Sequence, residues 1–158
     1  MSYFMHRIQK TGNDIQKGIE VHSSLDSAVL SFWGRVKLAY GKSDNDFVSC
    51  KITDEIGNVV APYDITWLKE GEDVANMFFL HHIRKEGDNY DKNIDVLNTI
   101  DSAKGDFAAL MEYGYNNPKY TNVSFVSCYI TDLLSGGMVL ESGVWVKTVS
   151  QPETEPEE

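Results

Sequence analysis

The sequence predicts an α+β protein made by tandem duplication of a ββαββ unit, with antiparallel sheets and one helix in each repeat. The stretch from Phe4 to Lys69 recurs from Phe79 to Lys147, and 22 of the 66 positions from 4 to 69 are identical in the second copy. Within each copy the apolar residues alternate at period 2, then recur at helical spacing, then alternate again. The two copies align at an offset of 75 up to the helix and at 78 after it.

Each element of the first copy has a local signal. Residues 3–10 and 18–22 alternate apolar and polar side chains around a Gly/Asn/Asp turn, which predicts a hairpin. Ser24 is a suitable N-cap for a helix that ends near Gly41. Residues 47–53 and 59–67 predict a second hairpin, and Pro62 places its return strand at a sheet edge.

The second copy repeats these signals in the same order. Thr99 is the predicted N-cap of its helix, and residues 125–131 and 138–146 predict the last hairpin. The predicted units are residues 1–70 and 77–149, joined by a polar segment at 71–76 and followed by a disordered acidic tail at 150–158.

We expect the two repeats to be related by a pseudo-twofold axis in a two-layer arrangement. The pattern leaves two versions open. In one, the sheets lie on one side and the helices on the other; in the second, the two sheets join edge to edge.

The charge balance bears on possible partners. The net charge is -10, but four of the acidic residues lie in the tail; without residues 151–158 the chain has 20 acidic and 14 basic side chains, a net charge of -6. A body without a basic patch argues against direct binding to nucleic acid. No apolar run is long enough for a signal peptide core or a membrane helix, so we expect a cytoplasmic protein.

Two cysteines, Cys50 and Cys128, occupy the same position in the two copies. Cys50 alternates with Val48 and Ile52 and should point into the core with them. In a reducing compartment we interpret both as buried structural thiols, because a nucleophilic cysteine needs a polar, partly exposed setting.

The pattern Phe-x-His-x-Ile-x-Lys opens both copies and places His6 and Lys10, and likewise His81 and Lys85, on one strand face. One interpretation is a ligand cleft on the pseudo-twofold axis, lined by these four residues with Trp67 and Trp145; the other is that the histidines are structural and bonded to a neighbouring strand. His81 and His82 point to opposite faces of a strand, so we expect no metal site.

Positions that differ between the copies suggest an interaction surface. Trp33 is replaced by Ala108, and Arg35 by Leu110. Trp33 and Trp67 are candidate anchors for a protein partner, with Arg35 beside Trp33, because exposed aromatic residues next to cations are typical of binding hot spots. The alternative is that Trp33 belongs to the core.

The motif H-R-I-Q-K-T-G at 6–12, a capped helix and I-T-D-x-x-G-N-V-V at 52–60 together resemble small uncharacterised single-copy proteins of Gram-positive bacteria and their prophages. The resemblance covers each repeat and implies no activity. It suggests an accessory protein that acts by binding a host component.

The sequence contains no phosphate-binding glycine loop, no G-x-S-x-G and no H-E-x-x-H, so we predict a protein that is not an enzyme and has no cofactor. The favoured function is binding to a protein partner, as an inhibitor or adaptor of phage or mobile-element type. The alternatives are a small-ligand (nucleotide-like) binding protein with a cleft between the repeats, and an acidic mimic of nucleic acid. Homo-oligomerisation stays open.

Overall fold

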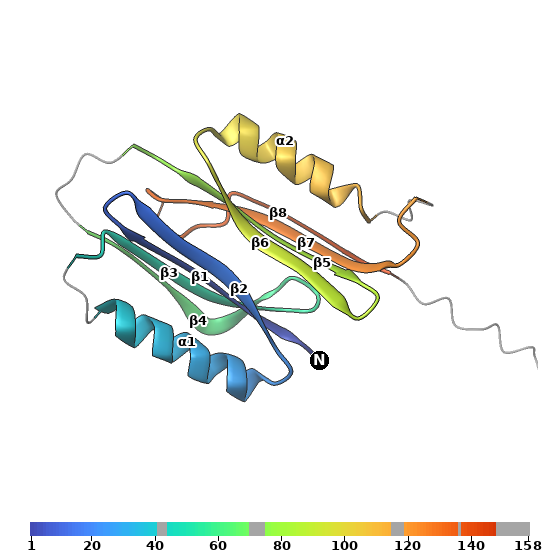
Figure 1. The fold of residues 1–158 in the computed structure, drawn as a ribbon, viewed down its shortest axis with the longest axis horizontal. Helices are drawn as coiled ribbons and strands as arrows, with labels where there is room; N and C mark the ends of the chain where they lie inside the picture. Colours follow the sequence, from blue (N-terminus) through green and yellow to red (C-terminus); the bar gives the residue numbers. More distant parts are fainter. Residues whose placement is uncertain (41–43, 70–74, 115–118, 136, 148–158) are drawn as a thin grey trace, which may run out of the picture.

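The computed structural model describes residues 1–40, 44–69, 75–114, 119–135 and 137–147, which form two four-stranded antiparallel sheets and two helices (Figure 1). The first sheet has the order β2-β1-β3-β4 and the second the order β6-β5-β7-β8. The elements of the first repeat are β1 (Tyr3–Thr11), β2 (Asp14–His22), α1 (Leu25–Tyr40), β3 (Phe47–Asp54) and β4 (Val59–Leu68). Those of the second are β5 (Phe78–Glu86), β6 (Asn89–Leu97), α2 (Ile100–Met111), β7 (Val123–Asp132) and β8 (Glu141–Val146). The ββαββ order predicted from the sequence is confirmed.

Two element boundaries differ from the predicted ones. β2 begins at Asp14, because Asp14 pairs directly with Thr11 across a two-residue turn in which Gly12 has φ +61°. β8 begins only at Glu141, because residues 138–140 belong to the longer connection between β7 and β8. The predicted joint at 71–76 falls largely, and the tail at 150–158 entirely, outside the described residues.

Each helix covers one face of its own sheet. Ser24 and Thr99 cap α1 and α2, since their hydroxyl oxygens accept the backbone N–H groups of Ser27 and Ser102. α1 packs on the side of the first sheet that carries Met5, Cys50 and Ile52, and α2 covers the equivalent side of the second sheet. No helix in the described residues is long and apolar enough to cross a membrane.

The other faces of the two sheets pack against each other. One apolar cluster unites residues of both repeats: Phe4, Ile8, Ile19, Phe47, Phe79, Ile83, Ile94, Phe125 and Leu133. The rings of Phe4 and Phe125 are stacked with their centroids 5.8 Å apart, and those of Phe47 and Phe79 are 5.7 Å apart. Each repeat is a two-layer unit, and the molecule therefore has the layer order helix, sheet, sheet, helix (Figure 1).

This packing differs from both versions that the sequence left open. The helices do not share a side, and the sheets meet by their faces, not by their edges. The reason is that both sides of each sheet are apolar: Met5 and Ile52 face a helix while Phe4 and Ile8 face the other sheet. A sheet with two apolar faces has to be covered twice.

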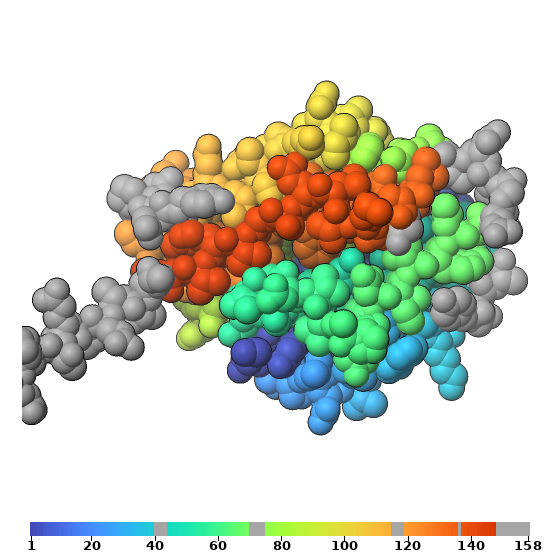
Figure 2. All heavy atoms as spheres, turned by 180° about the vertical axis from the view of Figure 1, so that it is seen from behind, coloured from blue at the N-terminus to red at the C-terminus, as the bar shows by residue number. Residues whose placement is uncertain are grey.

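The connections between β3 and β4 and between β7 and β8 dock reciprocally on the opposite repeat. A Cβ atom built on Gly57 would lie 2.0 Å from Val144 Cγ2, and one built on Gly137 would lie 2.1 Å from Thr66 Oγ1. Thr66 and Val144 are equivalent positions at the offset of 78. Equivalent strand positions therefore each receive the turn of the other repeat, as a pseudo-twofold interface requires, although the two glycines correspond to Ser135 and Val59 and not to each other. Seen from behind, residues 138–147 therefore run beside residues 55–68 (Figure 2).

We predict that Gly57→Ala destabilises the protein more than Gly12→Ala. Both glycines have positive φ, but a Cβ on Gly12 meets nothing within 4 Å. Gly12→Ala should cost about 1 kcal/mol of unfolding free energy, the usual penalty for a left-handed backbone, and Gly57→Ala about 3 kcal/mol because the methyl group also pushes the turn away from Val144. Urea unfolding of the two variants measures this; equal losses would mean that the turn does not hold the repeats together.

Candidate functional site

The two histidines of the repeated motif meet at the centre of the sheet interface. His6 from β1 and His81 from β5 are both buried, and their Nδ1 atoms lie 3.2 Å apart. His6 Nε2 lies 2.8 Å from Thr53 Oγ1, and His81 Nε2 lies 3.0 Å from Thr131 Oγ1. Thr53 and Thr131 are also equivalent positions, so a chain of hydrogen bonds crosses the pseudo-twofold axis.

The His6–His81 contact requires the two rings to be in different tautomers. One Nδ1 must carry the proton and the other must accept it, because two N–H groups or two lone pairs would repel. The ring whose Nδ1 donates then accepts at Nε2 from its threonine hydroxyl. The other ring donates its Nε2 proton to its threonine. The row of hydrogen bonds is therefore not symmetric, because the two histidines carry their protons on different ring nitrogens.

Burial keeps both rings neutral. Loss of hydration, reinforced by the positive charge of Lys51, lowers the pKa of His6 to about 3. Burial also lowers the pKa of His81 far below its usual value, with smaller contributions from His6, Lys51 and His82. The histidines are thus hydrogen-bonding members of the core, not proton carriers near neutral pH.

The surroundings of the histidines differ between the repeats. Tyr129 stacks on His81 with ring centroids 4.1 Å apart, and burial raises the pKa of Tyr129 well above 10. The equivalent residue in the first repeat is Lys51, which is also buried. Its ammonium group lies 3.3 Å from Asp64 Oδ2 and 3.3 Å from the carbonyl oxygen of Gly137, which belongs to the docked turn of the second repeat. Lys51 therefore links the two repeats beside the histidine pair.

The residues that the sequence grouped into a cleft do not form one. His6 and His81 are enclosed by the sheets. Lys10 donates to the carbonyl oxygen of Gly12 and lies 3.8 Å from Asp46, at the opposite end of the interface from Lys85. Trp67 and Trp145 lie on different edge strands and on the helix-covered sides of their sheets, opposite Val48 and Val126.

Trp33 and Arg35 lie on α1. Trp33 is exposed and touches Phe32 edge-on at 5.1 Å between ring centroids, so it is not part of the core. Arg35 Nε lies 3.9 Å from Glu20 on β2. Leu30 and Leu38 are exposed on the same helix. The structure places Trp33 among exposed apolar side chains of α1, whereas Trp67 belongs to the edge strand β4.

A larger apolar surface lies where the edge strands β4 and β8 run beside each other, and the sequence analysis missed it. It contains seven of the thirteen exposed large apolar side chains among the described residues: Ile56, Val59, Met138, Val139, Leu140, Val144 and Val146. We call it the β4–β8 face (Figure 2). Val59, Val139 and Val144 line one hollow of about 220 Å³ on it.

Among the described residues, no strand pairs with the outer edge of β8. Lys147 N–H donates to the carbonyl oxygen of Ser124, and the β7–β8 register pairs Val126 with Trp145. Because alternate residues of an antiparallel strand bond to the same neighbour, the backbone groups of Ser142, Val144 and Val146 point away from β7. No sequence pattern identified β8 as the accessible edge, since that depends on which strands end up outermost.

Metal binding finds no support in the geometry of the described residues, where no three His, Cys, Asp or Glu side chains come together. His82 points away from His81 and lies 3.1 Å from Asp95. Comparison of the chain with models of known protein families, with curated proteins and with solved structures found no match.

We predict that acid weakens the fold through the histidine pair. The pKa of each ring is lower in the folded protein than its usual 6.5, so below pH 6.5 the unfolded chain binds more protons. The stabilisation is complete above pH 6.5 and is lost as the pH falls toward 3. Between pH 7.5 and 5 the loss should be about 2 kcal/mol for His6, and a loss of the same sign is expected for His81.

Urea unfolding at pH 7.5, 6 and 5 measures this loss, and ring-nitrogen NMR of the folded protein gives the individual titrations. His6 and His81 should stay neutral at pH 5, with one proton on Nδ1 of one ring and on Nε2 of the other. Titration of either ring near pH 6.5 would contradict a buried neutral pair.

We also predict that both thiols are inert in the folded protein. Burial raises the pKa of Cys50 to about 11 and that of Cys128 to about 12, so almost no thiolate is present at neutral pH. A thiol reagent such as Ellman's should label neither cysteine in the native protein at pH 8 and both in 6 M guanidinium. Fast labelling of one residue under native conditions would show that the helix above it opens readily.

Proposed function

We propose that the protein is a non-enzymatic protein-binding module whose partner adds an extended segment to the edge of β8 on the β4–β8 face. The supporting observation is that β8 is the one edge strand of the described structure whose central residues include no charge and no proline. Strand addition of this kind uses backbone hydrogen bonds for affinity and side-chain pockets for specificity.

The four edge strands differ in a way that bears on this proposal. Exposed strand edges normally carry charges or proline, which prevent pairing with other chains. β2, β4 and β6 all do so, with Asp14, Lys17 and Glu20 on β2, Pro62 and Asp64 on β4, and Asp91, Lys92 and Asp95 on β6. In β8 the run Ser142–Val146 has neither a charge nor a proline.

The apolar surface next to this edge supports a partner with apolar side chains. Val144 and Val146 are exposed on β8, and Val59 and Ile56 continue the surface across the first repeat. Exposed apolar patches of this kind mark protein interaction sites. A segment lying along β8 would bury both the free backbone groups and these side chains, which suits an inhibitor or adaptor that works by occupying a strand or tail of its target.

The matched variants Ser142→Lys and Leu30→Lys test the proposal. Both residues are exposed, both changes add one positive charge, and neither removes a core contact. Ser142→Lys places the charge on the free edge of β8 and should weaken binding of the partner at least about tenfold, or about 1.4 kcal/mol. Leu30→Lys on α1 should leave binding unchanged.

The measurement is quantitative capture from an extract of the organism that carries the gene, followed by titration with the purified partner. Size-exclusion chromatography with light scattering of the protein alone shows whether the second strand comes from another copy of the same chain. Loss of binding in Leu30→Lys with retention in Ser142→Lys would transfer the binding surface to α1. Equal capture by both variants and the wild type would refute the use of either surface.

A further inference from the structure

The two ends of the sheet interface are built differently, although the repeats are equivalent. At one end Leu133 is fully buried, and Met77 packs beside it against the cluster that includes Phe47. At the opposite end the equivalent residues are Glu55 and Ser2. Polar residues stand where the other end has apolar ones, and the sheets enclose an open pocket of about 240 Å³ there.

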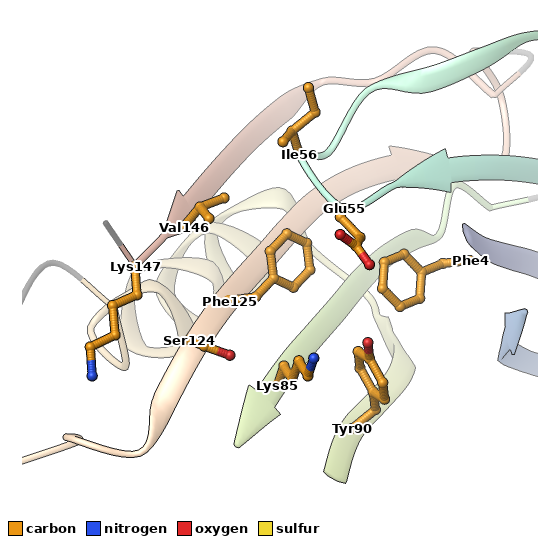
Figure 3. A pocket seen from close by; sticks show the side chains of 9 residues that line it. All are labelled: Phe4, Glu55, Ile56, Lys85, Tyr90, Ser124, Phe125, Val146 and Lys147. Carbon is orange, nitrogen blue, oxygen red and sulfur yellow. The ribbon is translucent and has the colours of Figure 1, made fainter. Parts of the chain in front are cut away.

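Five of the nine residues that line this pocket are aromatic or aliphatic. Phe4 and Phe125 are stacked at its base, and Tyr90 lies edge-on to Phe4 with ring centroids 5.6 Å apart (Figure 3). Ile56 and Val146 line the pocket toward the β4–β8 face. The pocket can therefore accommodate a ring or a branched aliphatic group.

Three charged side chains line the pocket, and none of them forms an ion pair within the described part of the chain. Glu55 accepts a hydrogen bond from the backbone N–H of Ser2, and Lys147 donates to the carbonyl oxygen of Thr121, 3.0 Å away. The ammonium group of Lys85 lies 5.5 Å from the centre of the Tyr90 ring, toward which it points in Figure 3. Within the described part of the chain, no carboxylate forms an ion pair with Lys85.

The closed end shows how the same lysine is neutralised elsewhere. Lys10, the equivalent of Lys85, lies 3.8 Å from Asp46, and the equivalent of Asp46 in the second repeat is Ser124. The open end has thus exchanged an acid for a hydroxyl beside its lysine, as well as an apolar plug for Glu55. The first exchange leaves Lys85 without an acid beside it, and the second leaves the pocket open for a ligand.

We propose that this pocket binds a small molecule with an apolar, ring-sized body and a single carboxylate, whose negative charge pairs with Lys85. Ser124 lines the same pocket and offers a hydroxyl donor. The negative charge of Glu55 favours a monoanion over a dianion. The pocket shares Ile56 and Val146 with the β4–β8 face, but ligand binding here does not require the strand edge of β8, so either function can exist without the other.

Three probes that share a phenyl group test whether the pocket prefers a negative charge: 3-phenylpropanoate, phenethylamine and 3-phenylpropanol. Titrations followed by amide NMR should show 3-phenylpropanoate binding at least about tenfold more tightly than the other two. The shifted signals should belong to Phe4, Lys85, Tyr90 and Phe125. Equal binding of the amine, no binding of the carboxylate at 10 mM, or shifts elsewhere on the molecule would overturn the proposal.

Two variants complete the test, the first of them with a matched control. Lys85→Gln should weaken 3-phenylpropanoate binding at least about tenfold, whereas Lys10→Gln, the same change at the closed end, should not. Glu55→Leu copies the closed end, so it should fill the pocket and abolish binding without lowering the unfolding midpoint. Unchanged binding in Lys85→Gln, or in a folded Glu55→Leu protein, would overturn the proposal.

Discussion

The face-to-face packing of the two sheets is the constraint on which the rest of the structure depends. A unit of about 70 residues can bury little apolar surface on its own, and each sheet here is apolar on both sides. When the two units stack, each sheet covers the apolar face that the other sheet would expose to water. Equivalent residues meet on the axis, as His6 and His81 do, and the equivalent positions Thr66 and Val144 each contact the turn of the other repeat. The molecule has the interface of a symmetric dimer within one chain.

Duplication also provides an internal comparison for every position. Some positions at which the copies agree join the two sheets, as His6 and His81 do, and Thr53 and Thr131 hold these histidines in place. Where the copies differ, one repeat makes a contact or leaves an opening that the other repeat lacks. Lys51 reaches across the interface to the turn of the second repeat, while Glu55 leaves one end of the interface open. The asymmetric positions are therefore where binding functions are to be sought.

The sequence predicted the fold of each repeat because hairpins and capped helices have local signals: the Gly12 turn, the Thr99 cap and the alternation around His6 are all visible within a few residues. It also predicted buried thiols, which the structure confirms. It did not predict how the repeats pack, because periodicity shows which strand face is apolar without showing what covers it. The sequence did not predict the β4–β8 face for the same reason. Trp33 and Trp67 are visible as aromatic residues, whereas a free edge at β8 exists only after the sheet order is known.

We infer that a partner chain lies along the outer edge of β8, and site-specific photo-crosslinking inside cells can detect this contact. A photoreactive amino acid is placed at Ser142 on that edge or, in a separate protein, at Leu30 on α1, and the covalent products are identified by mass spectrometry. The account predicts one discrete heteromeric product from position 142 and none from position 30, with the crosslinked partner peptide in an extended segment. Crosslinks from position 30 alone, or no product from position 142, would contradict it.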